Sequence, residues 1–160
     1  MEIIAYKKEY KEQVIKLILD IQNREAGIDL SLKEQPDLYD IQNSYMDKGG
    51  GFWIALDEKD EVIGTIGLIN KGKGYGILKK FFVRSDYRSK KVGFRLYEAL
   101  LAFCSDKDFK IIILDTPAVA KASHQFYERN GFSKITKEEL PISYEFPDRN
   151  SYLYLKHLKR

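Results

Sequence analysis

The spacing of apolar residues along the chain changes several times, and each spacing predicts a helix or a strand. Ile3 and Ile4 begin a short first strand. Apolar residues then recur every three or four positions, which predicts a helix over residues 9–24. The residues that define this helix are Val14, Leu17, Ile18 and Ile21. A second helix is predicted over residues 36–46, and the glycines at positions 49–51 end it.

The middle of the chain predicts an antiparallel meander of three strands. Two β-rich runs within GFWIALDEKDEVIGTIGLI flank the charged turn DEKDE at residues 57–61 and indicate a hairpin. A further turn, NKGKGYG, leads into the strand ILKKFFV at residues 77–83. The glycines of GKGYG, residues 72–76, suggest a phosphate-binding loop, but no helix follows them, which favours a hairpin turn.

Helical spacing returns after Arg88 and predicts a helix that ends near Ser105. The continuous apolar run IIILD at residues 111–115 is typical of a strand that is covered on both faces. A helix over residues 119–130 follows, and Gly131 favours the left-handed conformation in which many helices end.

Two last strands are predicted at residues 133–136 and 152–158, so the order of elements is β-α-α-β-β-β-α-β-α-β-β. The strand–helix–strand unit of residues 78–115 predicts that strands four and five are parallel, with a right-handed crossover. The sequence therefore predicts an α+β fold: a mixed, mostly antiparallel sheet with one parallel strand pair, flanked by helices.

Composition and charge are those of an ordinary globular protein and narrow the functional classes. The 160 residues are expected to form a single domain, residues 1–160, with 44% hydrophobic and 32% charged residues. A net charge of +3 is small for a nucleic-acid binder, so we expect no nucleic-acid partner. No apolar run approaches the roughly 20 residues of a membrane span, and the N-terminus lacks the layout of a signal peptide. We therefore expect a cytoplasmic protein without membrane association.

Cysteine and histidine are too few for a disulfide or a clustered metal site. Cys104 is the single cysteine, and its neighbours place it on the apolar face of a helix as a core residue. His124 and His157 are not clustered with it, so we expect no metal. His124 is interpreted as a surface residue or, alternatively, as a base or substrate contact, and His157 is assigned no role.

A strand, a short basic loop and the start of a helix follow one another in LKKFFVRSDYRSKKVGFR, residues 78–95. A helix N-terminus presents free backbone N–H groups, and its dipole favours an anion. The basic residues that crowd this place are Arg84, Arg88, Lys90, Lys91 and Arg95, with Asp86 against them. Because the positive charge is local, it favours a small phosphorylated ligand over a polyanion.

The order of elements and two motifs resemble the GNAT superfamily, the Gcn5-related N-acetyltransferases that use acetyl-CoA. The family's phosphate-binding pattern, Arg/Gln-x-x-Gly-x-Gly/Ala, is matched by Arg88-Ser89-Lys90-Lys91-Val92-Gly93 after FFVRSDY. The second motif is a helix that bears a tyrosine and ends in Gly-Phe, here SHQFYERNGF at residues 123–132. The resemblance covers nearly the whole chain and implies the GNAT (acyl-CoA N-acyltransferase) fold. It also implies a possible homodimer, since many relatives pair through their late strands.

The resemblance implies a set of coenzyme contacts and one catalytic residue. Tyr127 matches the family tyrosine near the thioester sulfur, and a phenol with a pKa of about 10 suits protonation of a leaving thiolate. Alternatively, Tyr127 is an aromatic packed on the inner face of its helix beside the core residue Phe126. The pantetheine arm would bind along the fourth strand and the diphosphate at the loop and helix start. The implied coenzyme contacts are Phe82, Val83, Arg88, Ser89, Lys90, Lys91, Val92, Gly93, Phe94 and Arg95.

Two positions depart from the family pattern. Lys91 stands where the family usually has its first glycine. We expect Lys91 still to donate its N–H, with a helical backbone and its side chain pointing outward. Ile77 stands where many relatives carry a glutamate that accepts a proton, so the residue that serves as general base is not identified.

Acidic residues offer candidates for the acceptor side, each with an alternative. Five acids lie in the segment that joins the first two helices, which walls the acceptor side in relatives. They indicate an amine acceptor or, alternatively, a solvated face. They are Glu25, Asp29, Glu34, Asp37 and Asp40. Asp115 ends the parallel strand, where ligand sites commonly form, but it could equally cap the next turn.

These observations predict an N-acetyltransferase that moves an acetyl group from acetyl-CoA to a primary amine of a small molecule or peptide. The amine would attack the bound thioester directly, with Tyr127 as general acid and without a metal. Two alternatives remain. The chain could be a non-catalytic acyl-CoA sensor, or a nucleic-acid-associated module that uses the segment from Arg84 to Arg95 as a basic patch.

Overall fold

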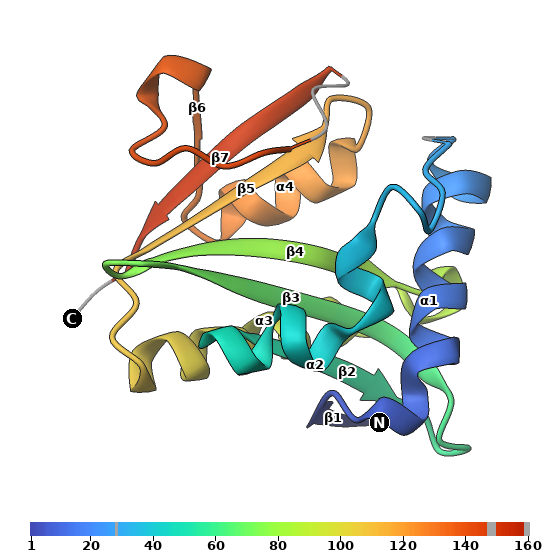
Figure 1. Cartoon of the computed structure of the whole chain (residues 1–160). Coiled ribbons are helices and arrows are strands. Elements are labelled where there is room, and N and C mark those ends of the chain that lie inside the picture. The colour runs from blue at the N-terminus through green and yellow to red at the C-terminus, as the bar shows by residue number, and fades with distance from the viewer. Residues whose placement is uncertain (28, 147–149, 159–160) are drawn as a thin grey trace.

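A computed structural model describes residues 1–27, 29–146 and 150–158 and contains one seven-stranded mixed sheet (Figure 1). The strand order across the sheet is β1-β2-β3-β4-β5-β7-β6. All neighbouring strands pair antiparallel except β4 and β5, which are parallel as predicted. The strands are β1 (Glu2–Ala5), β2 (Gly51–Leu56), β3 (Val62–Gly72), β4 (Tyr75–Val83), β5 (Ile111–Pro117), β6 (Ser133–Ile135) and β7 (Ser151–His157).

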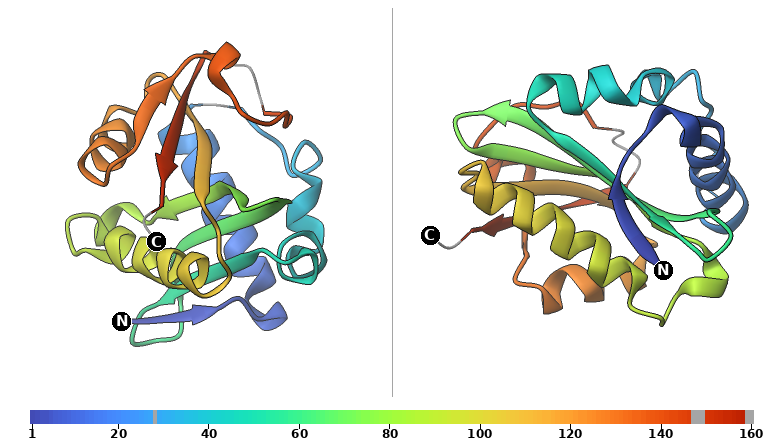
Figure 2. Two further views of the ribbon diagram at one scale, coloured as in Figure 1. Left: turned by 90° about the vertical axis from the view of Figure 1, so that its left-hand side faces the viewer. Right: turned by 90° about the horizontal axis from the view of Figure 1, so that it is seen from below.

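Helices cover both faces of this sheet. The helices are α1 (Lys11–Asp20), α2 (Ile41–Ser44), α3 (Val92–Asp106) and α4 (Lys121–Arg129). One apolar cluster unites residues of α1 and α2 with one face of the sheet, and a second cluster unites α3 and α4 with the other face. The view from below shows α2 and α1 on one side of the strands, and α3 and α4 on the other (Figure 2). The prediction of a mixed sheet flanked by helices is confirmed.

The prediction of one continuous helix over residues 36–46 is wrong. The segment forms a 3-10 turn (Pro36–Tyr39), then the single turn α2, then another 3-10 turn (Met46–Lys48). The break lies at Asp40, which has an extended φ of −147° and whose side chain accepts a hydrogen bond from the N–H of Asn43. Asp40 therefore acts as an N-cap that starts a new turn instead of continuing the old one.

The first helix also differs in detail from its prediction. A 3-10 turn (Lys8–Tyr10) precedes α1, and a π-helical turn (Ile21–Glu25) extends it. The π turn carries the buried Gln22, which bonds to Gln35, and Glu25, which pairs with Arg88 in the loop after β4. Such turns often occur at functional sites.

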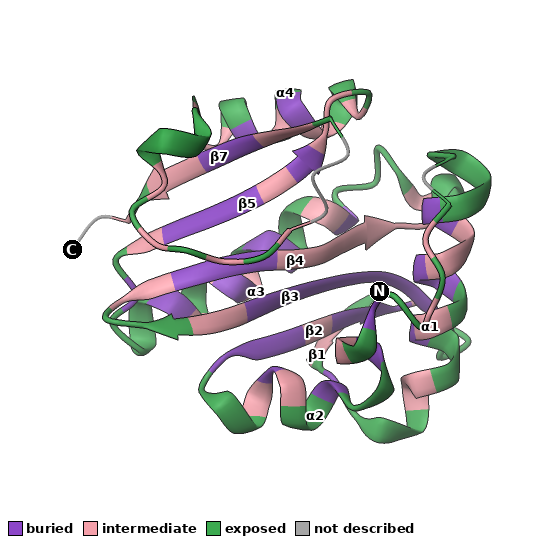
Figure 3. Cartoon of the chain, turned by 45° about the horizontal axis from the view of Figure 1, so that its top comes forward, coloured by how far each residue is buried: buried purple, intermediate pink, exposed green. Residues whose placement is uncertain are grey.

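The core occupies both sides of the central strands, with β2, β3 and the first half of β5 largely buried (Figure 3). Cys104 is fully buried on α3, as predicted, and burial raises the pKa of its thiol to about 12. It is therefore an inert core residue at neutral pH. No helix in the described part of the chain is both long and apolar enough to cross a membrane.

Strands β4 and β5 separate along their length, and this divergence positions the site. They pair only from Tyr75–Ile77 to Ile111–Ile113, and beyond this point β5 pairs with β7 alone (Figure 1). The second half of β4 is therefore unpaired on the side that faces β5. We call the space between the diverging second halves of β4 and β5 the splay.

A β-bulge in β4 lies next to the splay. The register between β3 and β4 shifts between Thr65 and Gly67, and Lys80 adopts a left-handed backbone with a φ of 53°. The hydroxyl of the fully buried Thr65 donates a 2.7 Å hydrogen bond to the carbonyl oxygen of Lys80. Thr65 thereby stabilises the bulge, which re-aims the side chains that follow it.

Candidate active site

The loop between β4 and α3 has a backbone that the sequence did not predict. The helix begins at Val92, and both Ser89 and Lys91 have left-handed backbones, with φ values of 70° and 62°. The expectation that Lys91 has a helical backbone is therefore wrong. This conformation favours glycine, which explains in physical terms why a glycine at this position suits the motif. The side chain of Lys91 does point outward, since the residue is exposed.

The start of α3 presents unbonded N–H groups, as the sequence predicted. The N–H of Arg95 bonds to the carbonyl of Lys91 at 3.1 Å and is the first to enter the helical pattern. Within the described residues, the N–H groups of Val92, Gly93 and Phe94 make no backbone hydrogen bond. Three donors and the positive end of a fifteen-residue helix thus meet at one place, which can hold an anion.

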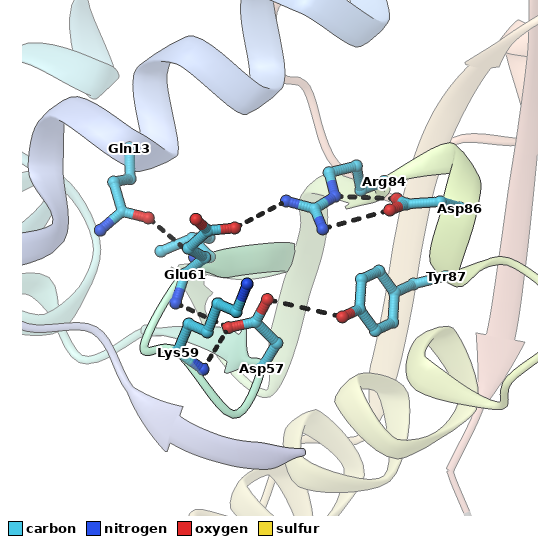
Figure 4. A network of polar contacts seen from close by, with 8 residues as sticks. Gln13, Asp57, Lys59, Glu61, Arg84, Asp86 and Tyr87 are labelled. Carbon is cyan, nitrogen blue, oxygen red and sulfur yellow. Dashed lines mark hydrogen bonds and ion pairs between the residues drawn. The ribbon is translucent and has the colours of Figure 1, made fainter.

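Two of the five predicted basic residues are already paired with carboxylates. Arg84 binds Asp86 at 2.8 Å and Glu61 at 3.4 Å, and this links the β2–β3 hairpin to the loop after β4 (Figure 4). The hydroxyl of Tyr87 donates to Asp57 in the same network. Arg84 is therefore a structural residue of the loop.

Arg88 is the second paired arginine. Its Nη1 atom lies 2.7 Å from Glu25 at the end of the π turn. Its Nε atom donates a 3.0 Å hydrogen bond to the carbonyl oxygen of Val83. Lys90, Lys91 and Arg95 are exposed and form no ion pair with the described residues, so they supply the available positive charge.

The register of β4 decides which backbone groups face the splay. Phe82 lies opposite Thr65, and the N–H of Arg84 donates to the carbonyl of Ile63 at 2.8 Å. Because bonded and non-bonded pairs alternate in an antiparallel ladder, the peptide groups of Phe82 point toward β3 and those of Val83 point toward the splay. The bond from Arg88 to Val83 agrees with this direction. Of the two predicted strand contacts, Val83 has the backbone orientation that an added strand-like ligand needs.

Side chains alternate along the same segment. Phe81 and Val83 belong to the cluster that contains α3 and α4, whereas Phe82 packs against the cluster of α1 and α2. A Cβ built on Gly93 would lie 3.5 Å from the ring of Phe81 and 3.6 Å from Val83, which is ordinary contact. The protein itself therefore has room for a side chain at Gly93, and close approach of a ligand gives a reason for glycine there.

Tyr127 combines a packed ring with a hydroxyl that has no hydrogen-bond partner among the described residues. The residue is 6% exposed, and its ring contacts those of Phe81, Phe132 and Tyr154. Its hydroxyl forms no hydrogen bond with the described residues, so the phenol O–H remains available as a donor. Burial raises the pKa of Tyr127, with a smaller contribution from Asp115, so the phenol keeps its proton.

The acids of the α1–α2 segment interact with other groups of the protein. Glu25 holds Arg88, and Glu34 accepts hydrogen bonds from the N–H and hydroxyl of Ser31. Asp37 accepts a 2.6 Å hydrogen bond from the hydroxyl of Tyr45, and Asp40 caps α2. These contacts account for the acids without an amine ligand, so the cluster gives no support for a particular acceptor.

A buried polar network that the sequence did not reveal joins this segment to the β4 bulge. Gln22 and Gln35 are 5% and 4% exposed and exchange two hydrogen bonds of 2.9 and 2.8 Å. The Nζ atom of Lys80 donates to Gln35 Oε1 at 2.7 Å and lies 3.8 Å from Asp37. Burial lowers the pKa of Lys80 and outweighs the opposing effect of Asp37. Isolated glutamines follow no periodic pattern in the sequence. The network forms in the folded chain, where Lys80 of the bulge meets Gln35.

His124 is buried, so its interpretation as a surface residue is wrong. Its Nε2 atom lies 2.9 Å from the carbonyl oxygen of Pro117, and its ring stacks against Tyr152. The carbonyl can only accept, so Nε2 carries the proton. His124 thereby ties α4, which bears Tyr127, to the end of β5.

Asp115 lies on β5 beyond its pairing with β4, at the splay. Its Oδ1 atom accepts a hydrogen bond of 3.4 Å from the hydroxyl of Tyr144. Burial raises the pKa of its carboxyl, against lowering effects of Lys79, Tyr144 and Lys80. The described residues contain no group of three or more histidine, cysteine or acidic side chains that could hold a metal ion.

Comparison with known proteins identifies the family. Residues 15–132 match the model of the Acetyltransferase (GNAT) family. An acetyltransferase from Streptococcus agalactiae 2603, known from a crystal structure, is 41% identical, with a TM-score of 0.94 and coverage of 98% of both chains. A GNAT-family acetyltransferase from Staphylococcus aureus Mu50 is 37% identical, with a TM-score of 0.93 and coverage of 99% of both chains.

A curated relative agrees over a shorter stretch. The probable N-acetyltransferase camello of Xenopus tropicalis is 33% identical over 109 residues, which are 66% of this chain and 49% of the relative. The chain thus spans about half the length of this relative. The family model covers most of the chain, and both bacterial structures cover nearly all of it. The chain therefore belongs to the GNAT family of acetyltransferases.

Proposed function

We propose that the chain is an N-acetyltransferase that transfers an acetyl group from acetyl-CoA to an amine by direct attack on the thioester. The observation that carries this proposal is the position of the unbonded N–H groups of Val92, Gly93 and Phe94. Gly93 lies against Phe81 and Val83 in the unpaired half of β4, so one extended ligand could reach both the helix start and the strand edge.

The residues of this region fit coenzyme A. The N–H groups at the start of α3 would hold the diphosphate, with Lys90, Lys91 and Arg95 as nearby cations. The peptide group of Val83, which points into the splay, would bind the pantetheine arm as a neighbouring strand does. The other predicted contacts, Phe82, Arg88 and Ser89, belong to the same strand and loop and would lie beside the bound coenzyme. When bound, acetyl-CoA supplies the acetyl group as an activated thioester.

Tyr127 is proposed as the general acid. Its ring packs against Phe81, Phe132 and Tyr154, and its hydroxyl forms no hydrogen bond with the described residues. Burial keeps the phenol protonated, which a proton donor needs. The thiol of coenzyme A has an ordinary pKa of about 8.5, below that of the phenol, so full proton transfer to sulfur is uphill by itself. It is driven by the return of a proton from the acceptor nitrogen to the phenol oxygen. We propose no acetyl-enzyme intermediate, because Cys104, the single cysteine, is fully buried and so is not available as a nucleophile.

The acceptor is proposed as a primary amine of a small molecule or peptide. The name of the camello relative supports an acceptor nitrogen, and the paired acids of the α1–α2 segment narrow it no further. The face of the splay that carries Lys80 and Asp37 is the proposed acceptor side, since Tyr127 lies on the opposite face.

A two-step measurement tests this function. Calorimetric titration with coenzyme A should give saturable binding with one site per chain. Thiol release from acetyl-CoA is then followed with a panel of spermidine, L-aspartate, kanamycin and an alanine-terminated peptide. Amine-dependent release and an acetylated product are expected. Tight coenzyme binding without release for any amine would favour the sensor, and absence of binding would contradict the coenzyme site itself.

A further inference from the structure

Asp115 and Tyr127 lie on opposite faces of the sheet beside the splay. Ile112 and Leu114 of β5 belong to the cluster of α3 and α4, as does Tyr127. Because successive side chains of a strand alternate between faces, Asp115 points to the face covered by α1 and α2. A reacting group in the splay would therefore have a phenol on one side and a carboxylate on the other.

The bulge in β4 gives Asp115 unusual neighbours. Lys79 and Lys80 are consecutive, yet both interact with groups on the α1/α2 face, since the bulge interrupts the alternation. The groups that face Asp115 are Lys79 and Lys80 from β4, Tyr144 from the loop before β7 and, through the splay, Tyr127 from α4. Lys79 in turn lies over the ring of Tyr144, with Nζ 5.7 Å from the ring centroid.

The other acids near the proposed acceptor side are bound to structural partners. Glu25 is paired with Arg88, Asp37 with Tyr45 and Lys80, and Asp40 with the N–H of Asn43. Within the described residues, Asp115 differs in that its one side-chain hydrogen bond comes from the hydroxyl of Tyr144 at 3.4 Å. Lys79 and Lys80 act on it electrostatically without an ion-pair contact, so carboxylate lone pairs remain available. Position 77, where a proton acceptor would be expected from the resemblance, is a fully buried isoleucine.

We propose that the carboxylate of Asp115 is the general base that takes a proton from the acceptor amine, and this rests on the proposed function. The acceptor enters as an ammonium and loses two protons from nitrogen overall. Asp115 takes the first, which frees the lone pair that attacks the thioester carbon. A C–N bond forms and the C–S bond breaks, while Tyr127 gives its proton to sulfur. The second proton from nitrogen restores the Tyr127 phenol, and the proton on Asp115 passes to water.

A raised pKa suits this role. A base is effective when its pKa lies near the working pH, and burial moves Asp115 in that direction. The same shift predicts the pH dependence. Protonation of Asp115 removes the base, so kcat/KM for an amine should fall as the pH drops through the pKa of Asp115.

The test compares Asp115→Asn and Asp115→Glu with Asp106→Asn, a control that removes one charge from the exposed end of α3. Two acceptors are used with each protein: the alkyl amine that reacts fastest in the panel, and acetohydrazide, whose nitrogen is already unprotonated at neutral pH. Calorimetry with coenzyme A checks each variant, since the coenzyme site does not include Asp115.

Asp115→Asn should bind coenzyme A within about twofold of wild type and lose about 10²- to 10⁴-fold in kcat/KM with the alkyl amine. It should lose much less with acetohydrazide, and its pH profile should lack the acidic limb. Asp115→Glu should recover part of the activity. Asp106→Asn should resemble wild type throughout.

Equal losses with both acceptors, or an unchanged acidic limb in Asp115→Asn, would overturn the role of Asp115. If Asp115→Asn does not fold, the pH profiles of kcat/KM for the wild-type protein decide. A fall at low pH with the alkyl amine but not with acetohydrazide would support Asp115 as the base. The same fall with both acceptors would overturn this role. Failure of wild type with every acceptor would instead contradict the proposed function.

Discussion

Arg88 and Glu25 form an ion pair of 2.7 Å that connects the proposed phosphate loop to the end of the first helix. The same arginine donates from Nε to the carbonyl oxygen of Val83, whose peptide group points into the splay. Arg88 thus links its own loop to the edge of β4 and to the segment that leads to the proposed acceptor side. Coenzyme binding at Val83 would place a ligand beside this pair.

Replacement of Glu25 should strengthen coenzyme binding slightly. Glu25→Gln removes the carboxylate that competes with phosphate for Arg88. Because the two side chains are 48% and 36% exposed, the pair is worth at most about 1 kcal/mol, or roughly fivefold in affinity. Calorimetry with coenzyme A at low and high salt measures the effect, which salt should reduce. Weaker binding in Glu25→Gln would mean that the pair shapes the loop for its ligand.

Replacement of Lys91 by glycine should stabilise the protein. The left-handed backbone of Lys91 carries a cost of about 1–2 kcal/mol that glycine does not have, partly offset by the greater entropy of glycine in the unfolded chain. We expect a net gain of up to about 1 kcal/mol in the free energy of unfolding, measured by urea denaturation. Lys90→Gly is the matched control, since Lys90 has no positive φ, and it should not be stabilised.

Gly93→Ala should separate coenzyme binding from stability. A Cβ at Gly93 makes only ordinary contacts with Phe81 and Val83, and alanine is the better helix former by about 0.5–1 kcal/mol. The free energy of unfolding should therefore be unchanged or slightly higher, while the Kd for coenzyme A should rise at least several-fold. An unchanged Kd would show that no ligand comes close to Gly93.

Tyr127→Phe should lower kcat by about 10²- to 10⁴-fold with little change in the Kd for coenzyme A. The raised pKa of Tyr127 keeps the acid protonated well above neutral pH, so wild type should show no loss of this acid between pH 7 and pH 9. Steady-state rates over this range test both statements. Tyr10→Phe, at the partly exposed start of α1, serves as the control and should retain full activity. Full activity in Tyr127→Phe would leave the tyrosine with a packing role alone.

The buried Lys80 predicts a pH-dependent stability. Its pKa is lowered in the folded protein from an ordinary value of 10.5, so the unfolded chain binds the proton more tightly. The free energy of unfolding should therefore increase as the pH rises through the lowered pKa toward 10.5. Lys80→Met should lose this increase when denaturation is followed between pH 7 and pH 10.5. A parallel pH dependence in both proteins would contradict the burial cost assigned to Lys80.

Most of the fold follows from local patterns. Alternation and turn residues located every strand, and the strand–helix–strand unit gave the parallel pair of β4 and β5. Helical spacing located α1, α3 and α4 to within a few residues. The prediction of one helix over residues 36–46 was wrong because the apolar residues there have helical spacing. Pro36 and the cap at Asp40 divide the segment into separate turns.

The site was predictable only in part, because several of its features depend on contacts between distant residues. The unbonded N–H groups at the start of α3 follow directly from a strand–loop–helix motif. The left-handed Lys91, the buried His124 and the network of Lys80 with Gln35 have no periodic signal. Likewise, the partners of Glu25 and Asp37 come from segments far along the chain, so the sequence could not show that these acids are already bound.

The proposed function depends above all on the start of α3, which would hold the diphosphate of coenzyme A beside the unpaired half of β4. A crystal structure of the protein with acetyl-CoA would show where the diphosphate lies. We expect diphosphate oxygens within hydrogen-bond distance of the N–H groups of Val92, Gly93 and Phe94, and a pantetheine amide bonded to Val83. A diphosphate bound elsewhere on the chain would contradict it.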